Sequence, residues 1–150
     1  MIFVWVLTMI DFDLNAFLPY RLATAASRVS KAFERRYTAA AGLTVPEWRV
    51  LAHLSQESEV SVREIEARVD MEKSKISRAA SRLEKQGLVK KVANAGDRRL
   101  VSLSLTDQGH ALIQKLVPLA LEFQKELIST LGPQAEAFLD GLTRVNNAKL

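Results

Sequence analysis

The stretch that decides the fold is residues 61–105, SVREIEARVDMEKSKISRAASRLEKQGLVKKVANAGDRRLVSLSL. Ser61 and Glu64 have the spacing of a capping box, which predicts a short helix that ends near Val69. A turn at Asp70 leads into a second helix over about residues 71–86, and Gly87 ends it. Two short helices joined by a tight turn predict a helix-turn-helix.

The second half of this stretch changes from a helical to a strand period. Residues 88–92 and 100–105 alternate between apolar and polar side chains, as half-buried strands do. The polar segment between them, residues 93–99, contains a glycine and predicts a turn. A β-hairpin that directly follows a helix-turn-helix is a wing, so we expect a mainly α fold with a small β-hairpin (α+β).

The second helix of the pair has two different faces. At 100° per residue, Ile76, Leu83 and the alanines between them point inward. Serines and long cations point outward or lie at the margins, and such side chains can reach bases or phosphates in a major groove. An ordinary amphipathic helix with a basic surface fits the same pattern. The candidate DNA-contacting residues of this helix are Ser74, Lys75, Ser77, Arg78, Ser81 and Arg82.

The hairpin favours DNA binding over the alternative of an ordinary amphipathic helix with a basic surface. Arg98 and Arg99 at an exposed turn could reach a minor groove, where narrow tracts concentrate negative potential. Asp97 could hold an arginine in an extended pose, although an exposed ion pair of this kind is worth only roughly 0–1 kcal/mol. The candidate wing residues are Lys90, Lys91, Asp97, Arg98 and Arg99.

Charge is concentrated in the same region. Residues 61–100 contain eleven basic and six acidic side chains, a net +5 in a chain whose total is +4. A basic block between nearly neutral flanks is the footprint expected of a protein that binds a polyanion.

Helical periods flank this lobe on both sides. Residues 18–41 and 45–56 predict two helices, and Thr44 and Glu47 form a capping box at the start of the second. Thr106 caps a long helix to about residue 131, in which Pro118 should cause a kink or free a carbonyl. A last helix is expected from Pro133 to about residue 146. The long helix carries two apolar stripes, and the second stripe predicts burial by another chain.

These patterns predict three parts of the chain: a winged helix-turn-helix lobe at 43–105, helical dimerisation segments at 14–42 and 106–150, and an N-terminal extension at 1–13. The apolar run MIFVWVLTMI is too short to span a bilayer, so no membrane association is expected. Met9 is a second plausible start, which leaves residues 1–8 as either an artefact of start assignment or an apolar arm for a partner subunit.

Composition excludes several classes of chemistry. The chain has no cysteine and only two histidines, so we expect no disulfide, no metal site and no cofactor, and a cytoplasmic location suits it. We find no nucleophile elbow, glycine-rich phosphate loop or histidine–carboxylate pair, and therefore expect no enzymatic activity.

Three strings together resemble the MarR (multiple antibiotic resistance regulator) family: LTVPEWRVLAHL (43–54), VSVREIEARVDMEKSKISRAASRLEKQGLVKK (60–91) and GDRRLVSLSLTDQG (96–109). The resemblance implies a homodimer on a near-palindromic operator. It assigns Arg99 to the minor groove, Asp97 to orienting it and Arg98 to phosphate. Lys90 and Lys91 depart from the family pattern, since an arginine commonly opens the wing.

The resemblance also implies a small anionic or aromatic effector held between the dimer helices and the lobe. The residues that could line such a site are Arg21, Arg28, Trp48, Arg49 and His53. The alternative is that Trp48 belongs to the core, His53 is a satisfied helix residue and the arginines are solvated.

Together these observations predict a DNA-binding transcriptional regulator. We expect a repressor that a small ligand releases from its operator. The alternative from another class is a winged-helix protein–protein adaptor without DNA binding. An adaptor would not need Arg78, Arg82 and Arg99 on the elements that face DNA.

Overall fold

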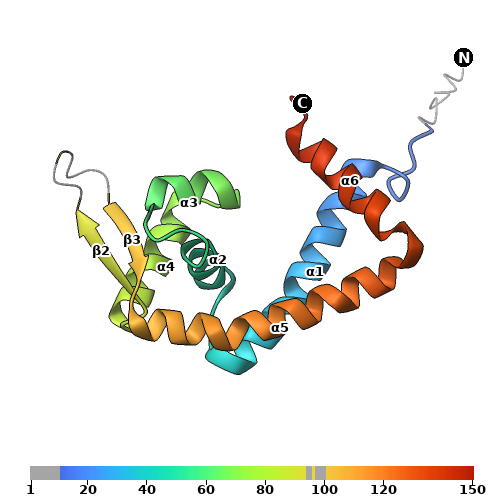
Figure 1. The fold of residues 1–150 in the computed structure, drawn as a ribbon. Helices are drawn as coiled ribbons and strands as arrows, with labels where there is room; N and C mark the ends of the chain where they lie inside the picture. Colours follow the sequence, from blue (N-terminus) through green and yellow to red (C-terminus); the bar gives the residue numbers. More distant parts are fainter. Residues whose placement is uncertain (1–10, 94–95, 97–100) are drawn as a thin grey trace, which may run out of the picture. The chain divides into compact units, whose positions relative to one another are not determined.

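The structure is a computed structural model that describes residues 11–93, 96 and 101–150. Helices dominate, and a small antiparallel sheet accompanies them, so the mainly α fold with a hairpin is confirmed (Figure 1). The elements are α1 (Leu18–Ala41), α2 (Val45–Leu54), β1 (Val60–Ser61), α3 (Val62–Val69), α4 (Lys73–Lys85), β2 (Val89–Ala93), β3 (Val101–Leu105), α5 (Asp107–Leu131), the 3-10 turn η1 (Gly132–Gln134) and α6 (Ala135–Asn147).

The chain divides into two compact units, Met1–Ala32 and Phe33–Leu150. In the described part of the first unit, a turn precedes α1, and the rings of Phe12 and Phe17 meet edge to face at 5.2 Å. Both rings are exposed to solvent.

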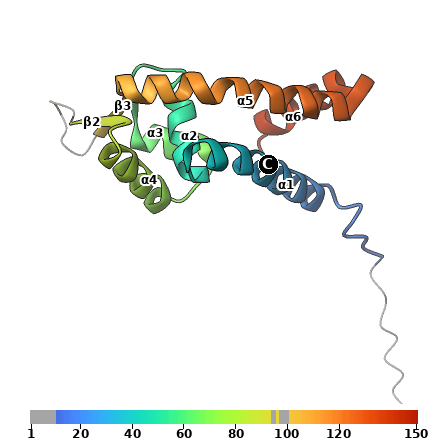
Figure 2. The same cartoon turned by 90° about the horizontal axis from the view of Figure 1, so that it is seen from below.

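In the second unit, α2, α3, α4 and the sheet form a lobe around one apolar core. Ile65 of α3, Ile76 and Leu83 of α4 and Leu103 of β3 are fully buried within it. The strand order is β1-β3-β2, with both pairings antiparallel. Figure 2 shows the strands beside the N-terminal end of α5.

Strand β1 is an element that the sequence did not predict. Its two residues pair with β3, Val60 opposite Leu103 and Ser61 opposite Ser102. Two residues are too few to show a strand period, and Ser61 carries the stronger signal of a helix cap. The capping box itself is confirmed: the Ser61 hydroxyl accepts from the Glu64 N–H at 3.1 Å, and a Glu64 carboxylate oxygen accepts from the Ser61 N–H at 2.8 Å.

The helix ends follow local chemistry, with small corrections to the predicted bounds. Helix α4 begins at Lys73 and not at residue 71, because Asp70 is left-handed (φ 49°) and Glu72 is extended. Helix α2 ends at Leu54. Pro133 lies in the 3-10 turn after Gly132, so α6 begins only at Ala135.

Gly109 determines how the sheet leads into α5. A Cβ atom at this position would lie 2.1 Å from the backbone oxygen of Leu88, which only glycine avoids. The Thr106 N–H donates to that same oxygen at 3.1 Å, and the Thr106 hydroxyl caps α5 by accepting from the Gly109 N–H. The start of α5 is therefore fastened to the start of the wing.

Further along, α5 leaves the core. It is continuous through Pro118, so the proline does not interrupt the helix. Ile113 and Leu116 before the proline are buried, whereas Val117 and Leu121 are exposed. No residue of α6 is fully buried.

An aromatic cluster joins α1, α2 and α5 within the second unit. The Phe33 ring stacks on Phe123 and meets Trp48 edge to face, both at 5.2 Å, and Tyr37 stacks on Trp48 at 5.4 Å. Burial raises the pKa of Tyr37 to about 12. Arg36 lies over the Phe123 ring and pairs with Glu126 of α5, which raises the arginine's pKa and lowers that of Glu126.

Candidate nucleic-acid interface

Helix α4 presents the two faces that its sequence predicts. Ile76, Ala79, Ala80 and Leu83 are buried under the helix. Of the candidate contact residues, four are exposed and two, the serines at 77 and 81, are partly buried. The exposed four are Ser74, Lys75, Arg78 and Arg82.

The centre of the outer face is free for a ligand. Arg78 is exposed, and its Nε donates to the backbone oxygen of Ser74 at 3.2 Å. This contact is local to the helix and leaves the terminal amino groups of the guanidinium available. A fork of this kind can donate two bonds to guanine or to a phosphate.

One flank of α4 is tied to the wing. The Lys91 ammonium on β2 donates to the Ser81 hydroxyl at 3.0 Å and pairs with Glu84 at 3.4 Å. Lys90, the other predicted wing cation in the described residues, is exposed. Lys91 thus holds strand β2 against α4, a role that the sequence did not predict.

The opposite flank is tied to α2. The Arg82 Nε donates to Glu47 Oε1 at 2.9 Å, where the carboxylate side chain is 4 % exposed and the arginine 50 %. The other carboxylate oxygen accepts the N–H of Thr44 at 2.8 Å and so caps α2. The sequence indicates Glu47 only as a cap, because no local pattern connects it to a residue in another helix.

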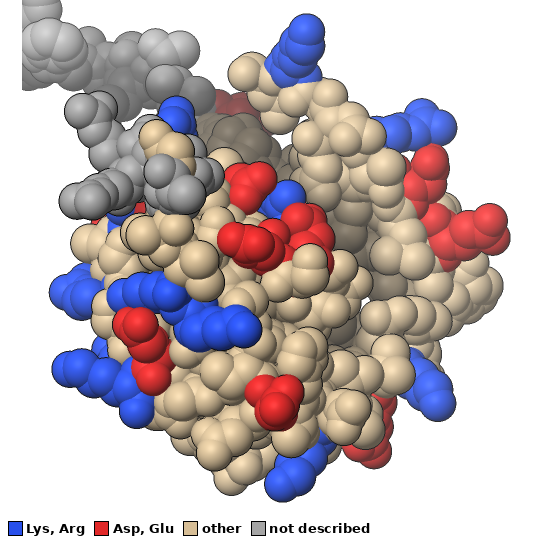
Figure 3. Space-filling view, turned by 60° about the vertical axis from the view of Figure 1, so that its left-hand side comes forward, with Lys and Arg blue, Asp and Glu red and all other residues tan. Residues whose placement is uncertain are grey.

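A hollow of about 580 Å³ lies between α3, α4 and the sheet. Three cations line it, Arg63, Lys73 and Lys91, together with the hydroxyls of Ser77 and Ser81. Arg63 and Lys73 were not among the predicted site residues, although they belong to the basic block. Figure 3 shows Lys and Arg side chains gathered on the lower left of this face of the lobe, with acidic side chains interspersed.

The tip of the wing lies outside the described residues. Asp97, Arg98 and Arg99 belong to it, so their predicted roles in the minor groove and at phosphate stay predictions.

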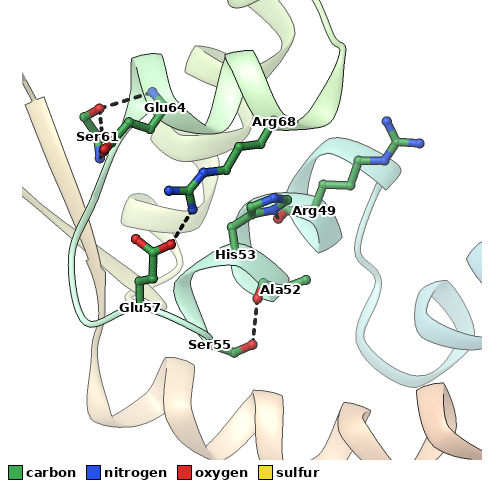
Figure 4. Close-up of polar contacts among 8 residues, drawn as sticks. All are labelled: Arg49, Ala52, His53, Ser55, Glu57, Ser61, Glu64 and Arg68. Carbon is green, nitrogen blue, oxygen red and sulfur yellow. Dashed lines mark hydrogen bonds and ion pairs between the residues drawn. The ribbon is translucent and has the colours of Figure 1, made fainter. Parts of the chain in front are cut away.

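The residues predicted for an effector site have other contacts in the lobe. Trp48 belongs to the aromatic cluster. Arg49 donates to the backbone oxygen of Val69 at 3.1 Å, and His53 Nδ1 lies 2.8 Å from the Arg49 oxygen. Figure 4 shows the Arg49 side chain extending away from His53, while Arg68 reaches Glu57. Arg21 and Arg28 lie in the first compact unit and are exposed.

Comparison with known proteins agrees with this arrangement. The MarR family model matches residues 41–100. A crystal structure of the MarR family transcriptional regulator SPO1453 from Silicibacter pomeroyi DSS-3 is 33 % identical, with a TM-score of 0.77, over 91 % of this chain and 100 % of that one. The chain belongs to the MarR family.

Two curated relatives of this MarR-family chain are regulators as well. The HTH-type transcriptional regulator PapX of Escherichia coli is 32 % identical over 77 % of this chain and 73 % of its own. The HTH-type transcriptional repressor MdtR of Bacillus subtilis (strain 168) is 34 % identical over 51 % of this chain, and the match spans about half of its length, 49 %. This chain is therefore a transcriptional regulator with a DNA-binding helix-turn-helix, and its family is not one of enzymes.

The described residues also bear on membrane spans and metal sites. None of the helices there is long and apolar enough to cross a bilayer. In the same part of the chain, no group of three or more histidine and acidic side chains is placed to hold a metal ion.

Proposed function

We propose that the chain acts in the cytoplasm as a homodimeric repressor that binds a near-palindromic operator. The observation that carries this proposal is the outer face of α4, which is exposed, cationic and held on both flanks by Lys91 and Glu47. A recognition helix held in this way enters a major groove without first having to be ordered.

Exposed apolar side chains support the dimer. Along α5 and α6 they are Val117, Leu121, Ile128, Phe138, Leu139 and Val145. Large apolar side chains gathered in this way on two helices of a small protein are typical of an interface, and a second copy would bury them. Two recognition helices related by a two-fold axis would then meet successive major grooves, roughly 34 Å apart.

Repression and effector release are the finer parts of the proposal. The match to MdtR, which is named a repressor, supports repression over activation. A small anionic or aromatic effector would release the operator by binding one arrangement of the dimer more tightly than the other. Because Arg49 and His53 already contact backbone atoms, such a ligand would have to compete with these contacts.

The test is a gel shift of the purified protein with its own upstream intergenic DNA, against unrelated duplex and at several salt concentrations. We expect a specific complex that contains two protein chains and weakens steeply with salt, because phosphate binding releases counterions. Arg78→Ala should weaken it by on the order of 1–3 kcal/mol. Lys125→Ala, which removes an exposed cation of α5, is the matched control.

A folded dimer that binds neither this DNA nor any duplex selected from the genome would contradict the proposal. That result would favour the protein–protein adaptor.

A further inference from the structure

Arg82 differs from the other outward cations of α4 in having a buried partner. Its Nε is bound to Glu47, while half of the side chain stays in solvent. Nη1 and Nη2 donate to no other group among the described residues. A guanidinium has five N–H donors, so four remain for a ligand.

The contact with Glu47 restricts where these donors can point. Arg82 follows Arg78 by four residues, so the two side chains are neighbours on the helix surface. Arg82 lies roughly 60° round the helix from the outermost direction, on the flank that faces α2. A side chain at the flank of a helix in the major groove approaches the groove wall, which is made of phosphates, while the centre approaches base edges.

Burial of the Glu47 carboxylate stabilises its contact with Arg82. A buried carboxylate is costly unless hydrogen bonds and an opposite charge compensate it. Here the Thr44 N–H supplies one bond and Arg82 supplies the charge. The arginine is therefore already oriented before any ligand arrives, which lowers the entropy lost on binding.

We propose that Glu47 is a positioning residue that holds Arg82 by its Nε, so that Nη1 and Nη2 bind a backbone phosphate of duplex DNA. Glu47 itself does not touch DNA. This inference rests on the proposed function, because it requires α4 to lie in the major groove. It assigns Arg82 to sequence-independent affinity and leaves base recognition to the centre of the face.

Arg82→Lys is the variant that separates the ion pair with Glu47 from the contact with DNA phosphate. A lysine has one compact ammonium. It can neutralise Glu47 or contact phosphate, but it cannot bind both at the same time as the guanidinium does. R82K should unfold in urea at nearly the wild-type midpoint. It should bind a mixed-sequence duplex about 10-fold more weakly, and the slope of log K against log salt should fall by about one per subunit.

Glu47→Gln provides the second arm of a double-mutant cycle. E47Q removes the buried charge, so the protein no longer needs a cation at position 82 for stability. In this background the lysine introduced by R82K is released from α2 and becomes free to reach phosphate. The double variant E47Q/R82K should therefore regain the salt slope that R82K alone loses. If Arg82 only stabilised the fold, E47Q/R82K would bind DNA with the same affinity and salt slope as R82K alone.

Arg35→Lys, at an exposed position on α1, is the control for an arginine-to-lysine change and should bind like the wild type. Wild-type affinity and salt slope in R82K overturn the inference, as does a double variant that binds no better than R82K. Absence of salt-dependent DNA binding by the wild-type protein would instead overturn the proposed function together with it.

Discussion

The lobe formed by α2, α3, α4 and the sheet differs sharply from the arm formed by the second half of α5 and by α6. In the lobe, apolar side chains such as Leu83 and Leu103 are inaccessible to solvent. In the arm, Leu121 is 54 % and Leu139 51 % exposed. The lobe therefore buries its apolar core within one chain, whereas the arm leaves large apolar side chains exposed to solvent.

Polar contacts between elements occur in both regions, but those of the lobe hold the flanks of α4. Those of the lobe join separate elements, as Arg82 with Glu47 and Lys91 with Ser81 do. In the arm, Glu126 of α5 pairs with Arg36 of α1, while the ion pair of Arg144 with Asp140 lies within α6, four residues apart. Contacts between elements orient a recognition surface, while a pair within a helix supports only that helix. The lobe thus carries the contacts that orient α4, whereas the arm carries exposed apolar side chains.

Leu83→Ala tests the completeness of the lobe and should have the largest effect. The side chain is fully buried, so its truncation should cost about 2–5 kcal/mol of unfolding free energy through lost burial and a cavity. Urea denaturation measures the loss. Leu150→Ala removes the same atoms from a fully exposed position and should change nothing. A loss below about 1 kcal/mol would mean that the lobe core is loosely packed.

Leu139→Asp tests the assembly role of the arm. A charge at the centre of an interface should cost on the order of 2 kcal/mol, about a 30-fold weaker dimer. Sedimentation over a range of protein concentrations measures the dissociation constant, and circular dichroism checks that the lobe stays folded. Val92→Asp places the same charge at an exposed apolar position on β2 and should leave the dimer intact. A dimer unaffected by L139D would show that another surface assembles the protein.

Alkaline pH should weaken the packing of α1 against α2 through Tyr37, whose ring stacks on Trp48. Burial holds the folded-state pKa at about 12, above the ordinary 10. The neutral phenol therefore stabilises the fold fully below pH 10, and about 2 to 3 kcal/mol is lost as the pH rises through 12. Urea midpoints of the wild type and Tyr37→Phe, measured from pH 8 to 12, should diverge with rising pH, the wild type losing more. Parallel curves would show that Tyr37 ionises freely.

Ser61→Ala probes the smallest effect, the cap of α3, and should cost about 1 kcal/mol at neutral pH. Ser55→Ala is the control for a serine-to-alanine change, because Ser55 follows the last residue of α2, donates its hydroxyl to Ala52 O and caps no free N–H at a helix start. Hydrogen bonds from Ser61 lower the pKa of Glu64 below its ordinary 4.5. The bond from the Ser61 hydroxyl to the Glu64 carboxylate is intact above that pH and weakens as the pH falls, so the gap between S61A and the wild type should narrow in acid. A gap that widens in acid would contradict this assignment.

Prediction from the sequence worked best for features that residues close together in the chain determine. The buried face of α4, the Ser61 cap and the two longer strands were all foreseen. The resemblance to the MarR family was likewise carried by contiguous strings. For the site, the exposure of Arg78 was foreseen, but the engagement of Arg82 and Lys91 with their neighbours was not.

The sequence by itself determined the order of elements, the faces of the helices and the basic character of residues 61–100. These follow from period, cap chemistry and charge, which act over a few residues. Only the tertiary structure decided that Arg82 meets Glu47 across 35 residues, that Arg36 meets Glu126 across 90, and that Val60 extends the sheet beside Leu103. Such pairings depend on how whole elements pack, and packing sums many weak contacts that no local pattern records.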